Sequence, residues 1–200
     1  LGLVGVTIDP EFPAKPYIYT VYSVQDAEGK LSQQLVRFNW KDNQIDPASE
    51  KMILQHGVDN SCCHTGGDLQ FGKNRELFYS TGDNTNPHEQ DGYNPIDFRE
   101  DKPHNDALRG AGNTQDLRGT VLRIRVSDDG SYTIPEGNLF KVAAQGRPEI
   151  YVMGARNPYT ITLDEKTGHL FYGDVGPDGN QTNDMKGSRG FDEVNRVTQA

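Results

Sequence analysis

The sequence predicts an all-β fold built from repeated strand-turn-strand units, as in a β-propeller, and three observations support this. The 200 residues include 22 Gly and 11 Pro but only 34% hydrophobic residues, a composition that suits short strands joined by polar loops. No long stretch has helical periodicity, and the best candidate, residues 46–57, could equally be a strand. Finally, three segments repeat one pattern of apolar strand, polar turn and aromatic-rich strand.

The three copies follow one another along the chain. They span residues 1–23, 66–84 and 157–177 and turn at Asp9-Pro10, Lys73-Asn74 and 166–168, respectively. A closed propeller needs about four to eight blades. About three copies therefore predict a partial propeller, with residues 1–200 forming one incomplete ring within a longer chain.

Two further segments, residues 31–40 and 119–134, are candidates for the outer strands of these units. In the second segment Leu122 and Ile124 alternate with Arg123 and Arg125. This alternation predicts a half-exposed antiparallel strand.

A polar insertion at residues 84–113 interrupts the second unit. It is rich in Asn, Asp, Gly and Pro, which is typical either of a solvated loop or of a lid that lines a site. Its two histidines, His88 and His104, are interpreted as surface residues.

The acidic charge of the chain argues against nucleic acid as a partner. The chain has 29 acidic and 20 basic residues, a net charge of -9, and no basic run that could follow a phosphate backbone, so nucleic acid is not expected. No apolar run approaches the roughly 18 residues of a membrane span. The chain lacks a starting Met and is interpreted as an internal piece, so the absence of a signal peptide carries no conclusion.

The two cysteines of the chain, Cys62 and Cys63, directly precede His64. A zinc site is disfavoured because adjacent cysteines on an extended chain point to opposite faces and no second pair exists. A cysteine nucleophile would need an apposed base, which adjacency to His64 does not provide. Two alternatives stay open: a strained disulfide between the neighbours, which would require an oxidising compartment, or two free buried thiols.

His64 is also a candidate general base. If the two strands of the second copy pair across the Lys73-Asn74 turn, His64 and Asp83 lie at the same edge of the sheet. A carboxylate on one imidazole nitrogen fixes the tautomer and leaves the other nitrogen basic. The alternative is a purely structural His–Asp pair.

The third copy places other groups at the corresponding ends of its strands. Arg156 and Asn157 offer a fork of donors and an amide, suited to a carboxylate or carbonyl ligand. Gly176 and Pro177 offer backbone carbonyls that Ca²⁺ accepts, although Gly-Pro is ordinarily a turn. Equivalent ends of propeller blades converge on one face, so a single site is expected.

Several acidic residues of the last segment could bind a second Ca²⁺ or simply be solvated; they are Asp178, Asp184, Asp192 and Glu193, together with Asn180. Asn180 also opens an Asn-Gln-Thr glycosylation sequon, relevant only in a eukaryotic secretory host.

Six motifs occur in an order that resembles the glucose/sorbosone dehydrogenase family. They are HTGGDLQFG, FYSTGD, DLRGTVLRI, IPEGNLF, RPEIYVMGARNPYTITLD and GP followed by GFDEVN. Each motif is weak alone, but together they cover nearly the whole chain. The resemblance implies the six-bladed β-propeller of soluble quinoprotein sugar dehydrogenases, which carries pyrroloquinoline quinone (PQQ) and Ca²⁺, with about three blades here.

The resemblance also implies site roles. His64 is similar to the family's catalytic base and Asp83 to the carboxylate that holds it. Arg156 and Asn157 look like the pair that contacts the quinone, and Gly176 and Pro177 like the carbonyl ligands of Ca²⁺. The implied reaction is oxidation of an aldose at its anomeric carbon to the lactone, by hydride transfer to PQQ.

The resemblance also implies a sugar substrate, an unidentified electron acceptor such as a cytochrome, and a periplasmic or extracellular location. Soluble glucose dehydrogenases carry an acidic residue where this chain has Cys63, so glucose is not implied as the substrate. A disulfide between Cys62 and Cys63 would lie beside the cofactor, by analogy with PQQ dehydrogenases of a different propeller type. The alternative functions are a non-catalytic extracellular binding propeller and, with less support, a calcium-stabilised lactonase-like hydrolase.

Overall fold

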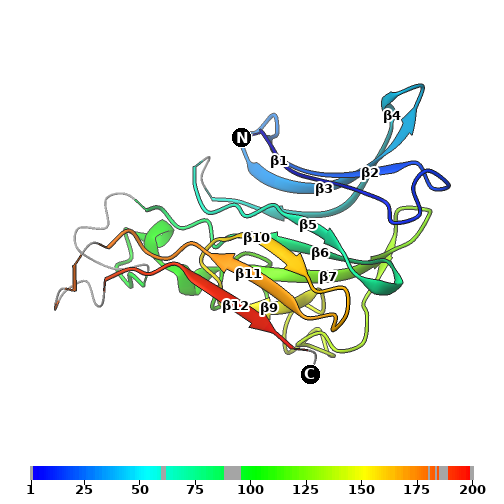
Figure 1. Cartoon of the computed structure of the whole chain (residues 1–200). Helices are drawn as coiled ribbons and strands as arrows, with labels where there is room; N and C mark the ends of the chain where they lie inside the picture. Colours follow the sequence, from blue (N-terminus) through cyan, green and yellow to red (C-terminus); the bar gives the residue numbers. More distant parts are fainter. Residues whose placement is uncertain are drawn as a thin grey trace.

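A computed structural model describes residues 2–59, 62–87, 96–179, 181–182, 184 and 189–198. It contains three antiparallel sheets that follow one another along the chain (Figure 1). Sheet A comprises β1 (Gly2–Ile8), β2 (Tyr17–Gln25), β3 (Leu31–Lys41) and β4 (Gln44–Gly57). Sheet B comprises β5 (Leu69–Phe71), β6 (Glu76–Thr81), β7 (Thr120–Val126), β8 (Tyr132–Thr133) and β9 (Ile150–Met153), and sheet C comprises β10 (Pro158–Leu163), β11 (Leu170–Asp174) and β12 (Glu193–Val197).

The prediction of an all-β, partial propeller is confirmed. Each repeated segment forms the first hairpin of one sheet: β1 pairs with β2, β5 with β6 and β10 with β11, all antiparallel. The first strands of the three sheets also lie against one another, β1 beside β5 and β5 beside β10. This is the arrangement of successive blades around a propeller axis.

The ambiguous segment 46–57 belongs to the long strand β4, so its strand interpretation is the one observed. None of the helical segments in the described part of the chain has the length and apolarity needed to span a bilayer.

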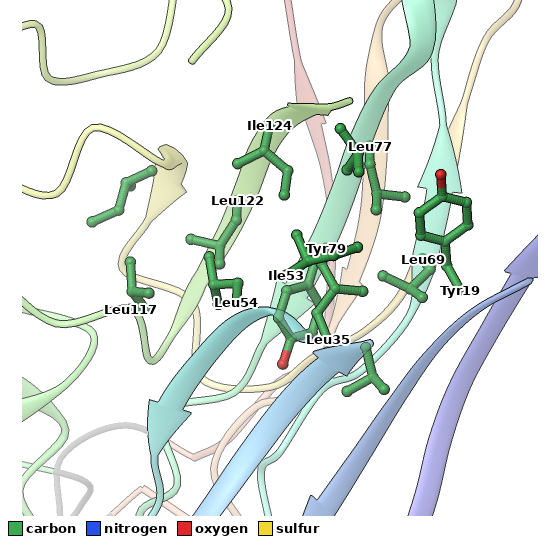
Figure 2. Packing of buried hydrophobic residues seen from close by; sticks show 13 residues of the cluster. Tyr19, Leu35, Ile53, Leu54, Leu69, Leu77, Tyr79, Leu117, Leu122 and Ile124 are labelled. Atoms are coloured by element: carbon green, nitrogen blue, oxygen red, sulfur yellow. The ribbon is translucent and has the colours of Figure 1, made fainter. Parts of the chain in front are cut away.

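The main hydrophobic core lies between sheets A and B (Figure 2). Side chains of β2, β3 and β4 pack there against those of β5, β6 and β7, including Tyr19, Leu35, Leu54, Leu77 and Leu122. A second cluster joins sheet B to sheet C and includes Phe78, Tyr151 and Ile161. Because neighbouring residues of β6 point to opposite faces, Leu77 and Phe78 enter different clusters. Sheet B is therefore buried on both faces.

The prediction that β7 is half-exposed is wrong. Arg123 is only 3% exposed, and its guanidinium lies 4.3 Å from the centroid of the Tyr151 ring and donates from Nε to Asn138 Oδ1 at 2.8 Å. A buried cation with an aromatic face and amide oxygens as partners can replace an apolar residue in a core.

A buried histidine, His56, gives the fold a pH dependence. Its Nε2 lies 3.1 Å from both Gln33 Oε1 and Tyr79 Oη, and burial lowers the pKa of His56 from 6.5 to about 4. The folded state therefore keeps His56 neutral, while the unfolded chain takes up a proton below about pH 6.5.

We expect the stabilisation from neutral His56 to be complete above pH 6.5 and to be lost as the pH falls toward 4, by about 3 kcal/mol. Urea unfolding of the whole protein between pH 7.5 and 4 would measure this against His56→Gln. The difference in unfolding free energy between the two proteins should shrink as the pH falls. A constant difference would contradict a lowered pKa.

Candidate functional site

His64 and Asp83 flank the β5–β6 hairpin. The pairing of Leu69 with Tyr79 and of Phe71 with Leu77 brings together the chain before β5 and the chain after β6. His64 Nδ1 lies 3.0 Å from Asp83 Oδ1. Both residues are buried, at 8% and 3% exposure.

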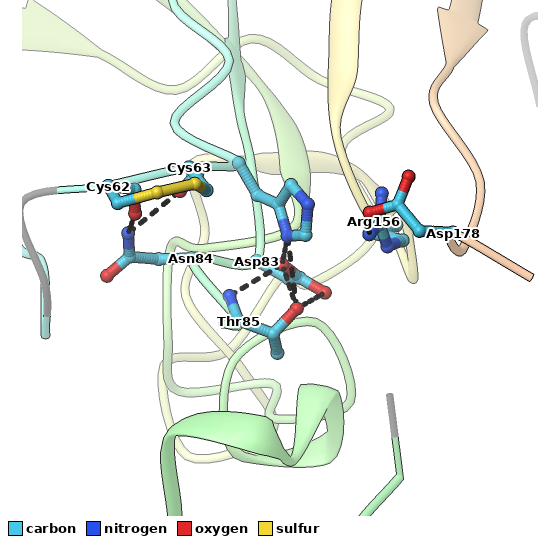
Figure 3. The surroundings of a disulfide bond; sticks show 8 residues. Cys62, Cys63, Asp83, Asn84, Thr85, Arg156 and Asp178 are labelled. Carbon is cyan, nitrogen blue, oxygen red and sulfur yellow. Dashed lines mark hydrogen bonds and ion pairs between the residues drawn. A yellow bond between two sulfur atoms is a disulfide. The ribbon is translucent and has the colours of Figure 1, made fainter. Parts of the chain in front are cut away.

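Thr85 is the third member of this group, and it was not predicted from the sequence. Its backbone N–H donates to Asp83 Oδ1 at 2.8 Å, and its hydroxyl lies within 3.0 Å of both carboxylate oxygens (Figure 3). Because Asp83 accepts, the Nδ1 of His64 carries the proton and Nε2 is the basic nitrogen. In the described residues no hydrogen bond engages that Nε2. The Asp-x-Thr spacing, typical of an Asx turn, is the one weak sequence signal for Thr85.

Arg156 and Asn157 lie in the turn between β9 and β10 and are held by Asp174, at the end of β11. The two backbone N–H groups donate to Asp174 Oδ2 at 3.1 Å and to Oδ1 at 2.7 Å. Burial raises the pKa of Asp174. Asp174 is thus a second site residue that was not predicted from the sequence, because the groups that it binds are backbone N–H groups.

The Arg156 guanidinium is 9% exposed, and burial lowers the pKa of Arg156. Its Nη1 donates to Val175 O at 2.9 Å and its Nη2 lies 3.6 Å from Asp178 Oδ2. Its Nε is buried without a hydrogen-bond partner in the described structure. A buried, unpaired N–H is a donor available to a ligand.

Direct hydrogen bonds join the two halves of the site. Asp83 N–H donates to Arg156 O at 2.8 Å, and Gly66 N–H donates to Asn157 Oδ1 at 3.2 Å. Sheets B and C therefore meet where their candidate residues lie, on the same side of the molecule.

A cavity of about 340 Å³ lies at this junction, and Asp83, Arg156, Gly176 and Pro177 are among its lining residues. His64, Asn157, Cys62 and Cys63 are not among them; His64 is connected to the cavity through Asp83. Gly176 N–H donates to Asp192 Oδ1 at 3.0 Å. Pro177 O already accepts from Gly179 N–H at 2.8 Å, which leaves it one lone pair for a metal.

The described part of the insertion forms one wall of the same cavity. Ile96, Ala107, Leu108 and Ala111 line it, near the short 3-10 turns η2 (Pro103–Asn105) and η3 (Ala107–Arg109). Residues 84–87 and 96–113 are described, whereas His88 lies outside the described residues. His104 is half exposed, with Nδ1 3.8 Å from Asp59 Oδ2, and it does not line the cavity.

Cys62 and Cys63 form a disulfide in the structure (Figure 3). Asn84, which follows Asp83, donates from its side chain to the backbone oxygens of both cysteines. Within the described residues no group of three or more His, Cys, Asp or Glu side chains could hold a metal ion. The second Ca²⁺ suggested near Asp178 is not supported there, and Asn180 lies outside the described residues.

The chain is similar to sugar dehydrogenases in sequence and in structure. The family model described as Glucose / Sorbosone dehydrogenase matches residues 1–200. Quinoprotein glucose dehydrogenase B of Acinetobacter calcoaceticus is 27% identical over 187 residues, which are 88% of this chain and 36% of that protein. The HIPL2 protein of Arabidopsis thaliana is 29% identical over 148 residues, 67% of this chain and 19% of that protein.

Among solved structures, a putative oxidoreductase (glucose dehydrogenase) from Thermus thermophilus superimposes with a TM-score of 0.72 at 29% identity, over 100% of this chain and 50% of that one. The chain thus spans half or less of the length of these relatives. The match over all 200 residues, together with the repeated hairpins and the fold, shows that the chain belongs to the glucose/sorbosone dehydrogenase family.

Proposed function

We propose that the whole protein is a PQQ- and Ca²⁺-dependent dehydrogenase that oxidises the anomeric C–OH of an aldose to the lactone. The observation that carries the proposal is the pair His64–Asp83, hydrogen-bonded at 3.0 Å and joined through Asp83 N–H to the Arg156 turn. The quinoprotein name of the Acinetobacter relative supports the cofactor class.

Arg156 offers a donor that suits the cofactor. The buried Arg156 Nε–H lacks a partner among the described residues and belongs to a residue that lines the cavity, as a site for a carboxylate- or carbonyl-bearing group requires. Arg156 and Asn157 would hold PQQ, and the carbonyl groups of Gly176 and Pro177 would hold Ca²⁺. When bound, the quinone supplies a hydride acceptor and the metal a Lewis acid.

In this mechanism His64 Nε2 takes the proton of the sugar hydroxyl. Asp83 keeps the imidazole in the required tautomer and stabilises the imidazolium that forms. Thr85 fixes the Asp83 carboxylate. The aliphatic side chains of the insertion, such as Leu108, give the cavity an apolar wall.

The disulfide supports a periplasmic or extracellular location, because disulfides persist in oxidising compartments. The reaction also requires an external electron acceptor, which is not assigned. The sugar itself is not assigned.

The test is dye reduction by the whole protein with a panel of aldoses, with and without PQQ and Ca²⁺. We expect reduction only when both are present, and bleaching of the oxidised quinone spectrum during anaerobic titration with the active sugar. If PQQ binds but no sugar reduces the dye, the protein is instead a non-catalytic binding propeller.

A further inference from the structure

Asn84 holds the main chain that carries His64. Its side-chain Nδ2 donates to Cys62 O at 3.3 Å and to Cys63 O at 3.1 Å, and its Oδ1 accepts from Asp59 N–H at 2.7 Å. Its own backbone N–H donates to His64 O at 3.0 Å. Asn84 is 2% exposed, so these bonds are shielded from water.

The segment that Asn84 holds has an unfavourable backbone conformation. Cys63 and His64 have φ angles of 70° and 48°, in the left-handed region that residues with a Cβ rarely occupy. Such conformations persist only where the surrounding structure imposes them. Asn84 has φ 57° itself, which Asn tolerates better than most residues. The hydrogen bonds of Asn84 therefore hold residues 63 and 64 in a conformation that this segment would otherwise leave.

Three consecutive residues thus act on His64 in different ways. Asp83 binds the imidazole, Thr85 orients Asp83, and Asn84 binds the main chain on either side of the disulfide (Figure 3). A shift of the main chain at His64 would carry Nε2 with it, even with Asp83 in place. Side-chain and main-chain restraints are both needed to fix the position of the base.

We propose that Asn84 is a positioning residue for His64, acting through the Cys62–Cys63 main chain. This inference rests on the proposed function, in which His64 is the base. It predicts that loss of the Asn84 amide lowers kcat and leaves sugar binding intact, since Asn84 is not among the residues that line the cavity.

Two substitutions distinguish the contribution of the Asn84 side-chain amide from that of the left-handed backbone at this position. Asn84→Asp keeps the shape of the side chain but replaces the Nδ2 donor with a carboxylate oxygen, which repels the backbone carbonyls of Cys62 and Cys63. Asn84→Gly keeps the left-handed φ and removes the side chain. In the whole protein loaded with PQQ and Ca²⁺, we expect each to lower kcat about 10- to 100-fold with KM changed less than about threefold. Amide hydrogen exchange of Asp59 and of residues 62–66 should accelerate.

Asn138→Asp is the matched control. Asn138 is 7% exposed and its Nδ2 also donates to two backbone carbonyls, Arg123 O at 2.9 Å and Pro148 O at 2.8 Å, away from His64. The new carboxylate would repel the two carbonyls, as in Asn84→Asp, while it still accepts from Arg123 Nε, and the variant should leave kcat unchanged. An Asn84 variant with wild-type kcat, or with a loss matched by Asn138→Asp, would overturn the inference. An inactive wild-type protein would instead overturn the proposed function.

Discussion

His64→Gln in the whole protein should lower kcat for aldose oxidation by about 10²- to 10⁴-fold, the usual contribution of a general base. Glutamine is close to histidine in size and can still hydrogen-bond to Asp83, but it has no basic nitrogen. Steady-state kinetics with the best aldose of the panel would measure the loss, after the quinone spectrum shows equal cofactor content.

His169→Gln is the control for this substitution. His169 lies in the turn between β10 and β11, where its backbone N–H donates to Thr167 Oγ1, at the ends of these strands away from Arg156 and Asp174. This variant should retain the wild-type kcat. If His64→Gln retained it too, His64 would not be the base, and the redox proposal would need another residue to accept the proton.

The largest expected effect on stability comes from Arg75→Met. Asp9 is 1% exposed; its carboxylate accepts from Arg75 at 2.7 and 3.2 Å and from Tyr19 Oη at 3.1 Å. Arg75 belongs to the β5–β6 turn and Asp9 follows β1, so the pair joins sheets A and B. Removing the cation leaves a buried carboxylate without its charge partner, and we expect a loss of about 3–5 kcal/mol.

Urea unfolding of the whole protein near pH 7 would measure this loss. Arg125→Met makes the same change at a side chain that is 43% exposed and pairs with Glu76 at 3.0 Å, where we expect less than about 1 kcal/mol. Adding Asp9→Asn to Arg75→Met should restore part of the stability, because the unpaired charge is then removed. Equal losses at Arg75 and Arg125 would contradict the buried-pair interpretation.

Much of the fold could be predicted because the repeated hairpins are local. The turns at Lys73-Asn74 and 166–168 are marked by their own residues, and the hairpin argument alone brings His64 and Asp83 to one edge. The burial of Arg123 could not be predicted, because its partners Asn138 and Tyr151 are distant in sequence. An alternating pattern cannot distinguish a solvated Arg from one enclosed by another segment.

The supporting residues of the site were missed for a related reason. The side chains of Asp174 and Asn84 bind backbone groups of other residues. Every residue type offers such backbone groups, so the identity of the partner residues gives no signal in the sequence. A short polar residue after a strand therefore looks like an ordinary turn. Only the folded chain shows which N–H and C=O groups such side chains reach, and hence which of them support the candidate site.

The Asp83–Arg156 and Gly66–Asn157 hydrogen bonds cross the boundary between two blades, and this gives the site a particular vulnerability. Slight separation of those blades on heating would pull the base away from the arginine turn while each hairpin stayed intact. Thermal inactivation should consequently begin several degrees before circular dichroism detects any loss of strand content.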